Sequence, residues 1–453
     1  MNNLFKMNLD ERRDMIINGD TVKTIMFLTI PTFMMAIVQV LIPFSDGLFL
    51  NKILGTDVGA GVSYMQPVYN MLIAISQGLS VVAMSMIGQL NGRGEYKGVK
   101  NVSLQVLVFG FILGIILMPA CYYGAEFLAP TDLVIRDYAI TYFALSSLII
   151  PFQFMAAIFN AIKSATGEPE ATFYRMIVLL ILKILFNTIY LTVLKMGLEG
   201  AIFASLTAYF FTTVWMYYDL FIKRSKFKLD IREYKFDYPI VKEMIRLAIP
   251  TIISYTSINF GFYLINAEIE IYGADVLAGL AIASQINNIC FTVPTSIGTT
   301  VTTMISMNIG VGNVEKSKEV YRKAVVIGEI VALLLLILTL STSKYLIALY
   351  DPSANVAIKT QEALNIYTYS VFPFALFVIT QSVFNALGRN IYPLIMSFLR
   401  IWVFRYLFII VTSKYLGYYS IFYGNLFSNF LAAAIFYLII RNSSWRSNIK
   451  YEE

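Results

Sequence analysis

An aspartate inside the first long apolar stretch of the chain is hard to explain as packing. Asp46 follows Pro43 by three positions within residues 24–50. A carboxylate inside a membrane span is costly unless it is paired, hydrated or protonated. Pro43 lacks the N–H that would bond the Gln39 carbonyl, so the helix is weakened there. Proton or cation occupancy at Asp46 can therefore couple to helix bending, unless the carboxylate is simply solvated at the outer end.

A later apolar stretch carries polar residues on one predicted helix face. Lys183 and Asn187 are four residues apart, Tyr190 extends the same stripe, and Ser205 in the next stretch is a candidate neighbour. We hypothesise an ion pair between Lys183 and Asp46. The ammonium would repel sodium and leave Asp46 to exchange protons. The alternative is a static buried pair that fixes helix packing.

Uncharged polar residues are also more numerous in the apolar stretches than a lipid-facing helix tolerates. Singly, each could hydrogen-bond between helices. As a set, they predict a wet cavity that would receive a small molecule. The cavity candidates are Tyr64, Gln66, Asn70, Tyr190, Gln285, Asn288, Gln381 and Asn385.

Catalytic and metal-binding constellations are missing from the sequence. The chain has no His, and its two Cys residues, Cys121 and Cys290, lie far apart in separate apolar segments. We therefore expect no zinc site, haem ligand or disulfide framework. No residue set supports catalysis, so we expect neither an enzyme nor a cofactor.

These candidate residues must be positioned by membrane-spanning helices. Of 453 residues, 58% are hydrophobic and 14% are charged, against roughly a quarter charged in soluble domains. Apolar windows bounded by Gly, Pro and charge clusters predict twelve spans. They lie near 24–50, 60–87, 102–124, 138–161, 173–194 and 200–222, and near 245–269, 276–305, 324–345, 363–387, 391–412 and 418–440.

Positive charge is distributed unequally between the two sides of these spans. With the termini inside, inner segments hold 25 Lys and Arg and outer loops hold 6, leaving three inside spans. This asymmetry predicts cytoplasmic termini in the cytoplasmic (inner) membrane. It also accounts for the net charge of +6 without a nucleic-acid partner. The polar N-terminal stretch does not read as a cleavable signal.

The chain repeats itself at an interval near 220 residues. Ile30-Pro31 returns as Ile249-Pro250, and Gly55-Thr-Asp-Val-Gly-Ala-Gly61 returns as Gly273-Ala-Asp-Val-Leu-Ala-Gly279. Gly92-Arg-Gly94 returns as Gly310-Val-Gly312, and Phe159-Asn-Ala161 returns as Phe384-Asn-Ala386. Four ordered matches indicate duplication. They predict an N-terminal segment 1–23, six-helix bundles 24–222 and 245–440 joined by a basic linker 223–244, and a tail 441–453, with a cavity between the bundles.

These repeats, together with Pro43-Phe-Ser-Asp46 and Gly88-Gln-Leu-Asn-Gly-Arg-Gly94, resemble the multidrug and toxic compound extrusion (MATE) family over about residues 20–440. The resemblance implies an all-α polytopic membrane protein, with twelve transmembrane helices in two pseudo-symmetric six-helix bundles arranged as a V. It implies export of amphipathic, often cationic, compounds driven by sodium or protons. We expect a monomer in the lipid bilayer.

The resemblance also locates a departure at the ion site. In archaeal-type members the fifth helix carries Asn and then Asp, four residues later, facing the first-helix Asp and a hydroxyl on helix 6. Here the matching positions read Lys183, Asn187 and Ser205, so only the hydroxyl is kept. This favours H⁺ over Na⁺ as the coupling ion. Spans 10 and 12 contain no acidic residue for the alternative site of other members.

A flippase for a lipid-linked oligosaccharide or cell-wall precursor is the competing function. Such a protein should meet a pyrophosphate with several cavity cations, and only Lys183, Arg400 and Arg405 lie inside predicted spans. In an α-helix, residues five apart are separated by about 140°. We therefore expect the two arginines to diverge, which favours the exporter.

Overall fold

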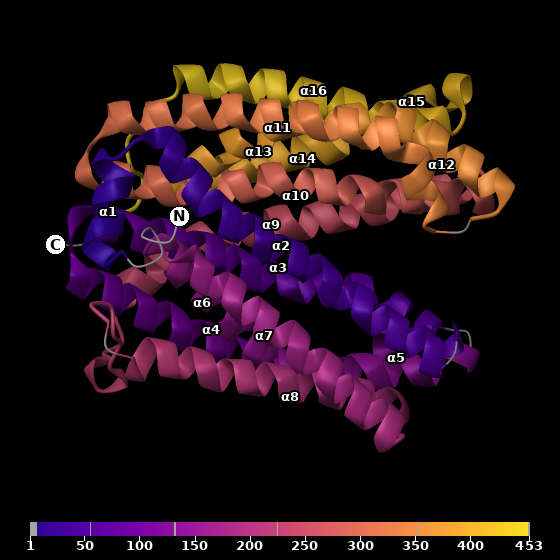
Figure 1. The fold of residues 1–453 in the computed structure, drawn as a ribbon, viewed down its shortest axis with the longest axis horizontal. Coiled ribbons are helices and arrows are strands. Elements are labelled where there is room, and N and C mark those ends of the chain that lie inside the picture. Colours follow the sequence, from indigo (N-terminus) through magenta and orange to yellow (C-terminus); the bar gives the residue numbers. More distant parts are fainter. Residues whose placement is uncertain (1–6, 55, 131–132, 224, 351, 452–453) are drawn as a thin grey trace. The chain divides into compact units, whose positions relative to one another are not determined.

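The computed structural model describes residues 7–54, 56–130, 133–223, 225–350 and 352–451. Regular structure in these ranges is exclusively helical (Figure 1). The first half contains α1 (Leu9–Asn18), α2 (Thr21–Phe49), α3 (Thr56–Arg93), α4 (Tyr96–Gly124), α5 (Leu133–Ser146), α6 (Ile150–Ala165), α7 (Pro169–Asn187) and α8 (Gly197–Tyr217). The second half contains α9 (Tyr238–Glu270), α10 (Ala274–Val311), α11 (Val314–Ala348), α12 (Ala354–Tyr367), α13 (Val371–Ala386), α14 (Ile391–Phe398), α15 (Leu407–Leu416) and α16 (Tyr419–Asn442).

Short segments of other helical types interrupt or extend these α-helices. Four are π-helical: Leu50–Leu54, Thr188–Val193, Tyr218–Ile222 and Leu399–Tyr406. Four are 3₁₀ turns: Glu126–Leu128, Ser147–Ile149, Ile231–Glu233 and Thr368–Ser370. The 3₁₀ turns at 147–149 and 368–370 join α5 to α6 and α12 to α13, so each pair forms one predicted span.

The polytopic all-α fold predicted from the sequence is confirmed. Eleven of the described helices, counting joined pairs as one, are long and apolar enough to cross a membrane. They coincide with the predicted spans 1 to 6 and 8 to 12. The seventh predicted span, 245–269, lies within α9.

The duplicated glycine loops mark equivalent helix ends. α3 and α10 each have 38 residues, well beyond the roughly 20 needed to cross a membrane. Gly94 follows α3 with a φ of +76°, and Gly312 caps α10 with a φ of +82°. A left-handed residue at this position ends a helix, and glycine adopts it without strain. The repeated glycines in the sequence therefore end the equivalent helix in each half of the chain.

The described chain separates into two compact units whose limits fall inside helices. Unit 1 contains Met1–Arg13, Ile30–Ile252 and Ile449–Glu453, and unit 2 contains Asp14–Thr29 and Ile253–Asn448. The chain therefore passes from one unit to the other within α1, α2 and α9. Local packing explains this: Thr29 in α2 hydrogen-bonds Thr300 within unit 2 at 3.0 Å. The domain limits expected from the sequence stay a prediction.

Both chain ends are held by specific contacts. In unit 1, Arg12 forms an ion pair with Glu170 at 2.6 Å and the Tyr451 hydroxyl donates to the Met86 carbonyl at 2.9 Å. In unit 2, the Asn448 amide donates to the Leu387 carbonyl at 2.8 Å. Exposed termini fray unless they are tied down in this way, so residues 9–18 and 443–451 are parts of the folded units.

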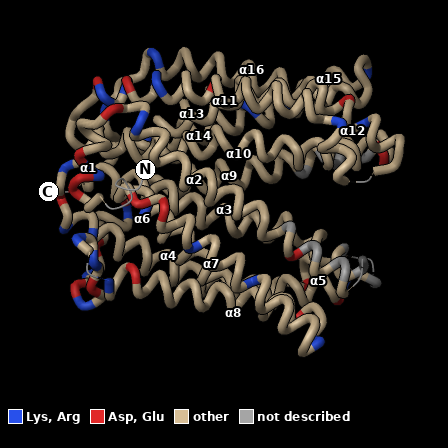
Figure 2. Tube along the Cα trace, viewed as in Figure 1, with Lys and Arg blue, Asp and Glu red and all other residues tan. Residues whose placement is uncertain are grey.

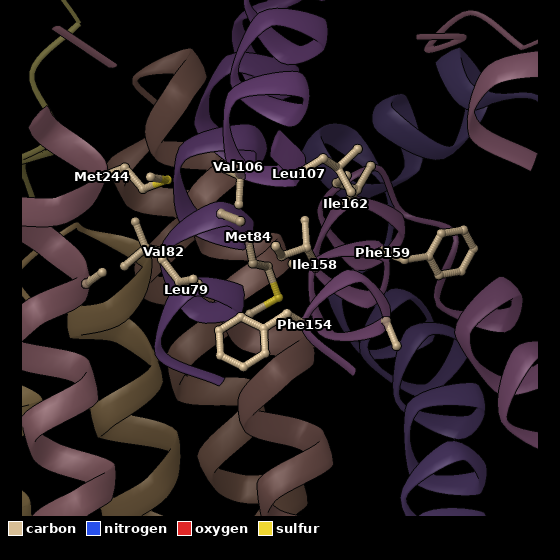
Figure 3. Close-up of a cluster of buried hydrophobic side chains, with 14 of the residues drawn as sticks. Leu79, Val82, Met84, Val106, Leu107, Phe154, Ile158, Phe159, Ile162 and Met244 are labelled. Carbon is tan, nitrogen blue, oxygen red and sulfur yellow. The ribbon is translucent and has the colours of Figure 1, made fainter. Parts of the chain in front are cut away.

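A large apolar core of unit 1 forms where α3, α4 and α6 meet. Leu79, Val106, Phe154 and Ile158 are all buried there (Figure 3). Small residues allow the close approach of α4 and α6. A Cβ on Gly114 would lie 2.7 Å from the Pro151 Cα atom, so side-chain rotation could not relieve the clash.

We expect Gly114→Ala to destabilise the protein by about 1–3 kcal/mol, because an added methyl must displace backbone in a close-packed core. The check is the thermal midpoint of the purified protein, followed by size-exclusion chromatography in detergent. Gly124→Ala is the matched control, since nothing lies within 4 Å of a Cβ built on that helix-terminal glycine. Equal midpoints for the two variants would contradict the proposed α4–α6 contact.

Candidate functional site

The first candidate site lies in unit 1, where α2 and α7 bring an acid and a base together. Lys183 forms an ion pair with Asp46 through its Nζ atom, as the sequence predicted. The Lys183 side chain is 7% exposed and that of Asp46 is 29% exposed. Figure 2 shows how few charged residues interrupt the long uncharged stretches of these helices. The pair is therefore a buried base that holds a partly accessible acid.

Asn187 completes the contacts of the carboxylate. Its Nδ2 atom donates to the other oxygen of Asp46 at 3.3 Å. Lys183 and Asn187 lie one turn apart on α7, so both side chains reach α2 from the same face. Each oxygen of the Asp46 carboxylate thus accepts a hydrogen bond from a side chain of α7. A charge shielded from water needs such partners.

Two other predicted members of this site have different contacts. The Ser205 hydroxyl donates to the Ala201 carbonyl of its own helix at 3.2 Å, and among the described residues it has no hydrogen bond with Asp46. The Tyr190 hydroxyl lies 3.3 Å from that of Thr207. Tyr190 belongs to the π-helical segment Thr188–Val193, which changes the face it presents relative to an α-helix.

A polar network not foreseen from the sequence connects other helices of unit 1. Tyr69 donates to Gln153 at 2.9 Å, and Gln153 donates to Tyr209 at 3.4 Å. Tyr142 donates to Gln66 at 3.2 Å. A glutamine inside an apolar span was the available signal for Gln153. The tyrosines gave none, because they are common fillers of membrane helices.

The predicted cavity residues belong to both units, and their local contacts differ. Gln66 donates to Asn70 at 3.1 Å, and Tyr64 is 49% exposed. In unit 2, Gln381 donates to Ser397 at 2.9 Å. The remaining members divide by burial: Gln285 and Asn288 are exposed, and Asn385 is half-buried. Asn70 and Asn288, which correspond through the repeat, are both exposed.

Unit 2 contains two buried arginines, and their expected divergence is wrong. Arg400 and Arg405 lie in the π-helical segment Leu399–Tyr406, not in an α-helix. Hydrogen bonds in a π-helix join residues five apart, so residues at that spacing return to nearly the same face. Arg400 donates to Asn429 at 3.2 Å and Arg405 donates to Tyr367 at 3.4 Å.

Comparison with known proteins identifies the family. The MatE family model matches residues 31–189 and 250–411, one match in each half of the chain.

This chain belongs to the MatE family.

Curated relatives of this MatE chain include two proteins of Bacillus subtilis (strain 168). "Probable multidrug resistance protein YoeA" is 22% identical over 366 residues, which is 78% of each chain. "Probable multidrug resistance protein YpnP" is 22% identical over 443 residues, covering 95% of this chain and 97% of the relative. These matches span most of both proteins.

Solved structures share the MatE fold. One, titled "Outward-facing conformation of a multidrug resistance MATE family transporter of the MOP superfamily", matches with a TM-score of 0.89 and 23% identity, over 94% of this chain and 96% of the other. Another, titled "Crystal structure of MATE in the bent conformation", matches with a TM-score of 0.87 and 23% identity, over 95% and 96%. The protein is accordingly a multi-pass membrane transporter with the twelve-helix MATE fold, and not an enzyme.

The described part of this MatE protein offers charged and hydrogen-bonding side chains for its chemistry. No group of three or more His, Cys, Asp or Glu residues that could hold a metal ion is found among the described residues. Cys121 and Cys290 are both buried and free. The ion pair of Asp46 with Lys183 in unit 1 and the two arginines of unit 2 place charged side chains inside predicted spans.

We expect Asp46→Asn to destabilise this MatE protein by about 2–3 kcal/mol, because it leaves the Lys183 ammonium buried without its counter-charge. Lys183→Met in the same chain removes that penalty, so the double variant should recover much of the loss. Thermal midpoints of the wild type, both single variants and the double variant give the coupling between the two residues. Strictly additive losses would show that the two side chains do not interact.

Proposed function

We propose that this protein is a secondary active antiporter that exports amphipathic, often cationic, organic compounds across the cytoplasmic membrane by alternating access between its two bundles. Family membership and the multidrug resistance names of its relatives support this proposal. The observation that carries the coupling step is the ion pair between Asp46 and Lys183.

Protons are the proposed coupling ion. The Lys183 ammonium occupies the position next to the Asp46 carboxylate, where a sodium ion would otherwise bind. Protonation of Asp46 removes its charge and leaves a buried cation without a partner, which is unfavourable. The free energy of proton binding is thereby linked to rearrangement of α2 against α7. We propose that Asn187 positions the Asp46 carboxylate. We propose that Ser205 joins the polar face of Lys183 and Asn187 after the rearrangement.

Bending of α2 is the proposed rearrangement. The helix continues through Pro43, three residues before Asp46. A proline inside a helix removes one backbone hydrogen bond and permits a kink. Solved relatives with this fold are titled for straight and bent conformations, which supports a bending step in this chain.

We propose cytoplasmic termini in the inner membrane, a monomer, and a substrate cavity lined from both halves. The excess of Lys and Arg in the inner segments supports the orientation. Exposed or half-buried polar side chains support the cavity assignment. They are Tyr64, Gln66, Asn70, Tyr190, Gln285, Asn288, Gln381 and Asn385.

A lipid-linked precursor flippase is the second candidate. The shared π-helical segment of Arg400 and Arg405 favours it, because two cations on one face suit a phosphate. The exporter keeps precedence, since the curated relatives bear multidrug resistance names.

We expect ethidium uptake into inside-out vesicles to be driven by a proton gradient and to fall to the background of empty vesicles in Asp46→Asn. Loss of the Asp46 carboxyl removes the proposed coupling step, while ethidium remains a suitable lipophilic cation. Glu126→Gln, a carboxyl change in the 3₁₀ turn after α4, is the control and should retain uptake. Undiminished proton-driven uptake in Asp46→Asn would exclude Asp46 as the coupling residue.

We expect Lys183→Asn to increase the sodium dependence of that uptake. Removing the ammonium restores net negative charge beside Asp46 and supplies an amide oxygen that a cation can use. Uptake is measured under sodium gradients in the wild type and the variant, with the proton gradient collapsed. If sodium has the same effect on both proteins, Lys183 does not select the coupling ion.

A further inference from the structure

The two arginines of the π-helical segment Leu399–Tyr406 have no acidic partner in the described part of the chain. Arg400 is 7% exposed and Arg405 is 2% exposed. No described carboxylate lies within 4.0 Å of either guanidinium. In unit 1, by contrast, the buried Lys183 has Asp46. Charged residues inside membrane spans mark functional sites by default, and here the missing component is an anion.

The geometry of the segment directs both side chains into one region of unit 2. Its π-helical hydrogen bonding brings positions five apart to nearly the same face. The segment approaches α9 closely at Gly261, where a Cβ would lie 2.3 Å from the Ile401 Cγ2 atom. A larger residue at position 261 would have to displace the Ile401 side chain.

Both guanidiniums retain unused hydrogen-bond donors. An arginine has five N–H groups, and within the described residues each of these makes one hydrogen bond, to Asn429 and to Tyr367. Both acceptors are neutral oxygens. The Nε atoms of Arg400 and Arg405 are buried and have no partner there. Unused donors on two like charges fit the oxygens of a carboxylate, sulfonate or phosphate.

Aromatic rings lie against both guanidiniums. Arg400 lies over Phe374 and Phe377, at 5.6 and 4.8 Å from the ring centres, and Arg405 lies over Phe262 at 5.3 Å. Phe262 is 36% exposed. The rings hold the cations without neutralising them, and one of the two rings that contact Arg405 is partly exposed.

An apolar aromatic surface lies along the same segment. Trp402 packs against Phe260 and Phe398, with ring centres 5.6 and 5.9 Å apart, and its indole N–H donates to the Ser257 hydroxyl at 2.9 Å. Phe260 is 44% exposed and Phe398 is 46% exposed. Two cations and an exposed aromatic surface on one segment match a compound with an anionic group and an apolar body.

We infer that Arg400 and Arg405 form a binding site in unit 2 for the anionic group of an amphipathic compound, whose apolar body contacts the Trp402 surface. The inference deepens the proposed transport function and rests on it for the site's purpose, although binding itself needs no ion gradient. The shared chemistry is an oxyanion, borne either by a soluble organic acid or by a phospholipid headgroup.

Arg175 of α7 provides the comparison that separates this site from ordinary packing. It corresponds to Arg400 through the repeat, is 2% exposed, and donates to Asn160 at 3.2 Å and to the Met176 sulfur at 2.8 Å. It has no second arginine in its segment. A buried arginine alone therefore occurs in both bundles, whereas the pair on a π-helix is particular to unit 2.

The test is binding of carboxyfluorescein to the purified full chain in a non-ionic detergent, followed by fluorescence anisotropy. Decanesulfonate and decyltrimethylammonium, with the same tail and opposite charge, are the competitors. Micelles containing phosphatidic acid or phosphatidylcholine form the lipid arm, and chloride is titrated separately. We expect decanesulfonate or phosphatidic acid to displace the dye and decyltrimethylammonium to fail. Competition by decanesulfonate would indicate a soluble organic acid, and competition by phosphatidic acid would indicate a phospholipid headgroup.

Arg400→Gln and Arg405→Gln should each weaken dye binding by roughly tenfold to a hundredfold, since a charge-assisted hydrogen bond is lost. Arg175→Gln should bind like the wild type. If the glutamine variants do not fold, Arg400→Lys and Arg405→Lys keep the charge and should show a smaller but measurable loss. Equal competition by both decyl compounds, competition by chloride alone, or full binding in the folded arginine variants would overturn the inference.

These outcomes are separate from those of the proposed function. Gradient-driven ethidium uptake without anion-selective binding would leave the exporter standing and reject the arginine site. Selective binding without any gradient-driven uptake would keep the site and reject the antiporter.

Discussion

A charge placed in hydrocarbon must be neutralised, and this constraint explains the arrangement of unit 1. Asp46 and Lys183 come from helices far apart in the sequence, and their ion pair fixes how α2 meets α7. The pair is asymmetric in exposure, with the base more deeply buried than the acid. Events at Asp46, such as proton binding, therefore act on a cation that cannot easily be solvated. The stabilising contact and the proposed coupling step are the same interaction.

Several buried cations have different kinds of partner in the two halves of the chain. In unit 1 the lysine has a carboxylate, and Arg175 has an amide and a thioether as partners. In unit 2, Arg400 and Arg405 have one neutral oxygen each and several aromatic rings. Duplication preserved the fold and the glycine helix stops while the charged residues diverged. This division favours ion coupling in the first half and binding of an anionic group in the second.

Much of the fold was predictable from the sequence because hydrophobic length determines membrane spans. The ion pair was also predictable, because Lys183 and Asn187 share an α-helical face and a carboxylate inside a span needs a partner. The face shared by Arg400 and Arg405 was not predictable, since π-helical hydrogen bonding leaves no mark on the apolar pattern. The network through Tyr69, Gln153 and Tyr209 was missed for a similar reason, because contacts between spans depend on helix rotation.

The most direct measurement of the central interaction is a solid-state NMR dipolar recoupling experiment between lysine ¹⁵Nζ and aspartate ¹³Cγ in lipid. The described chain also contains ion pairs of Asp219 with Lys163 and Lys223, and of Asp10 with Lys226. The informative quantity is thus the difference between the wild type and Asp46→Asn. The account predicts that a short-range dephasing component of the wild type disappears in the variant. Identical dephasing in the two proteins would show that Asp46 and Lys183 do not touch in the membrane.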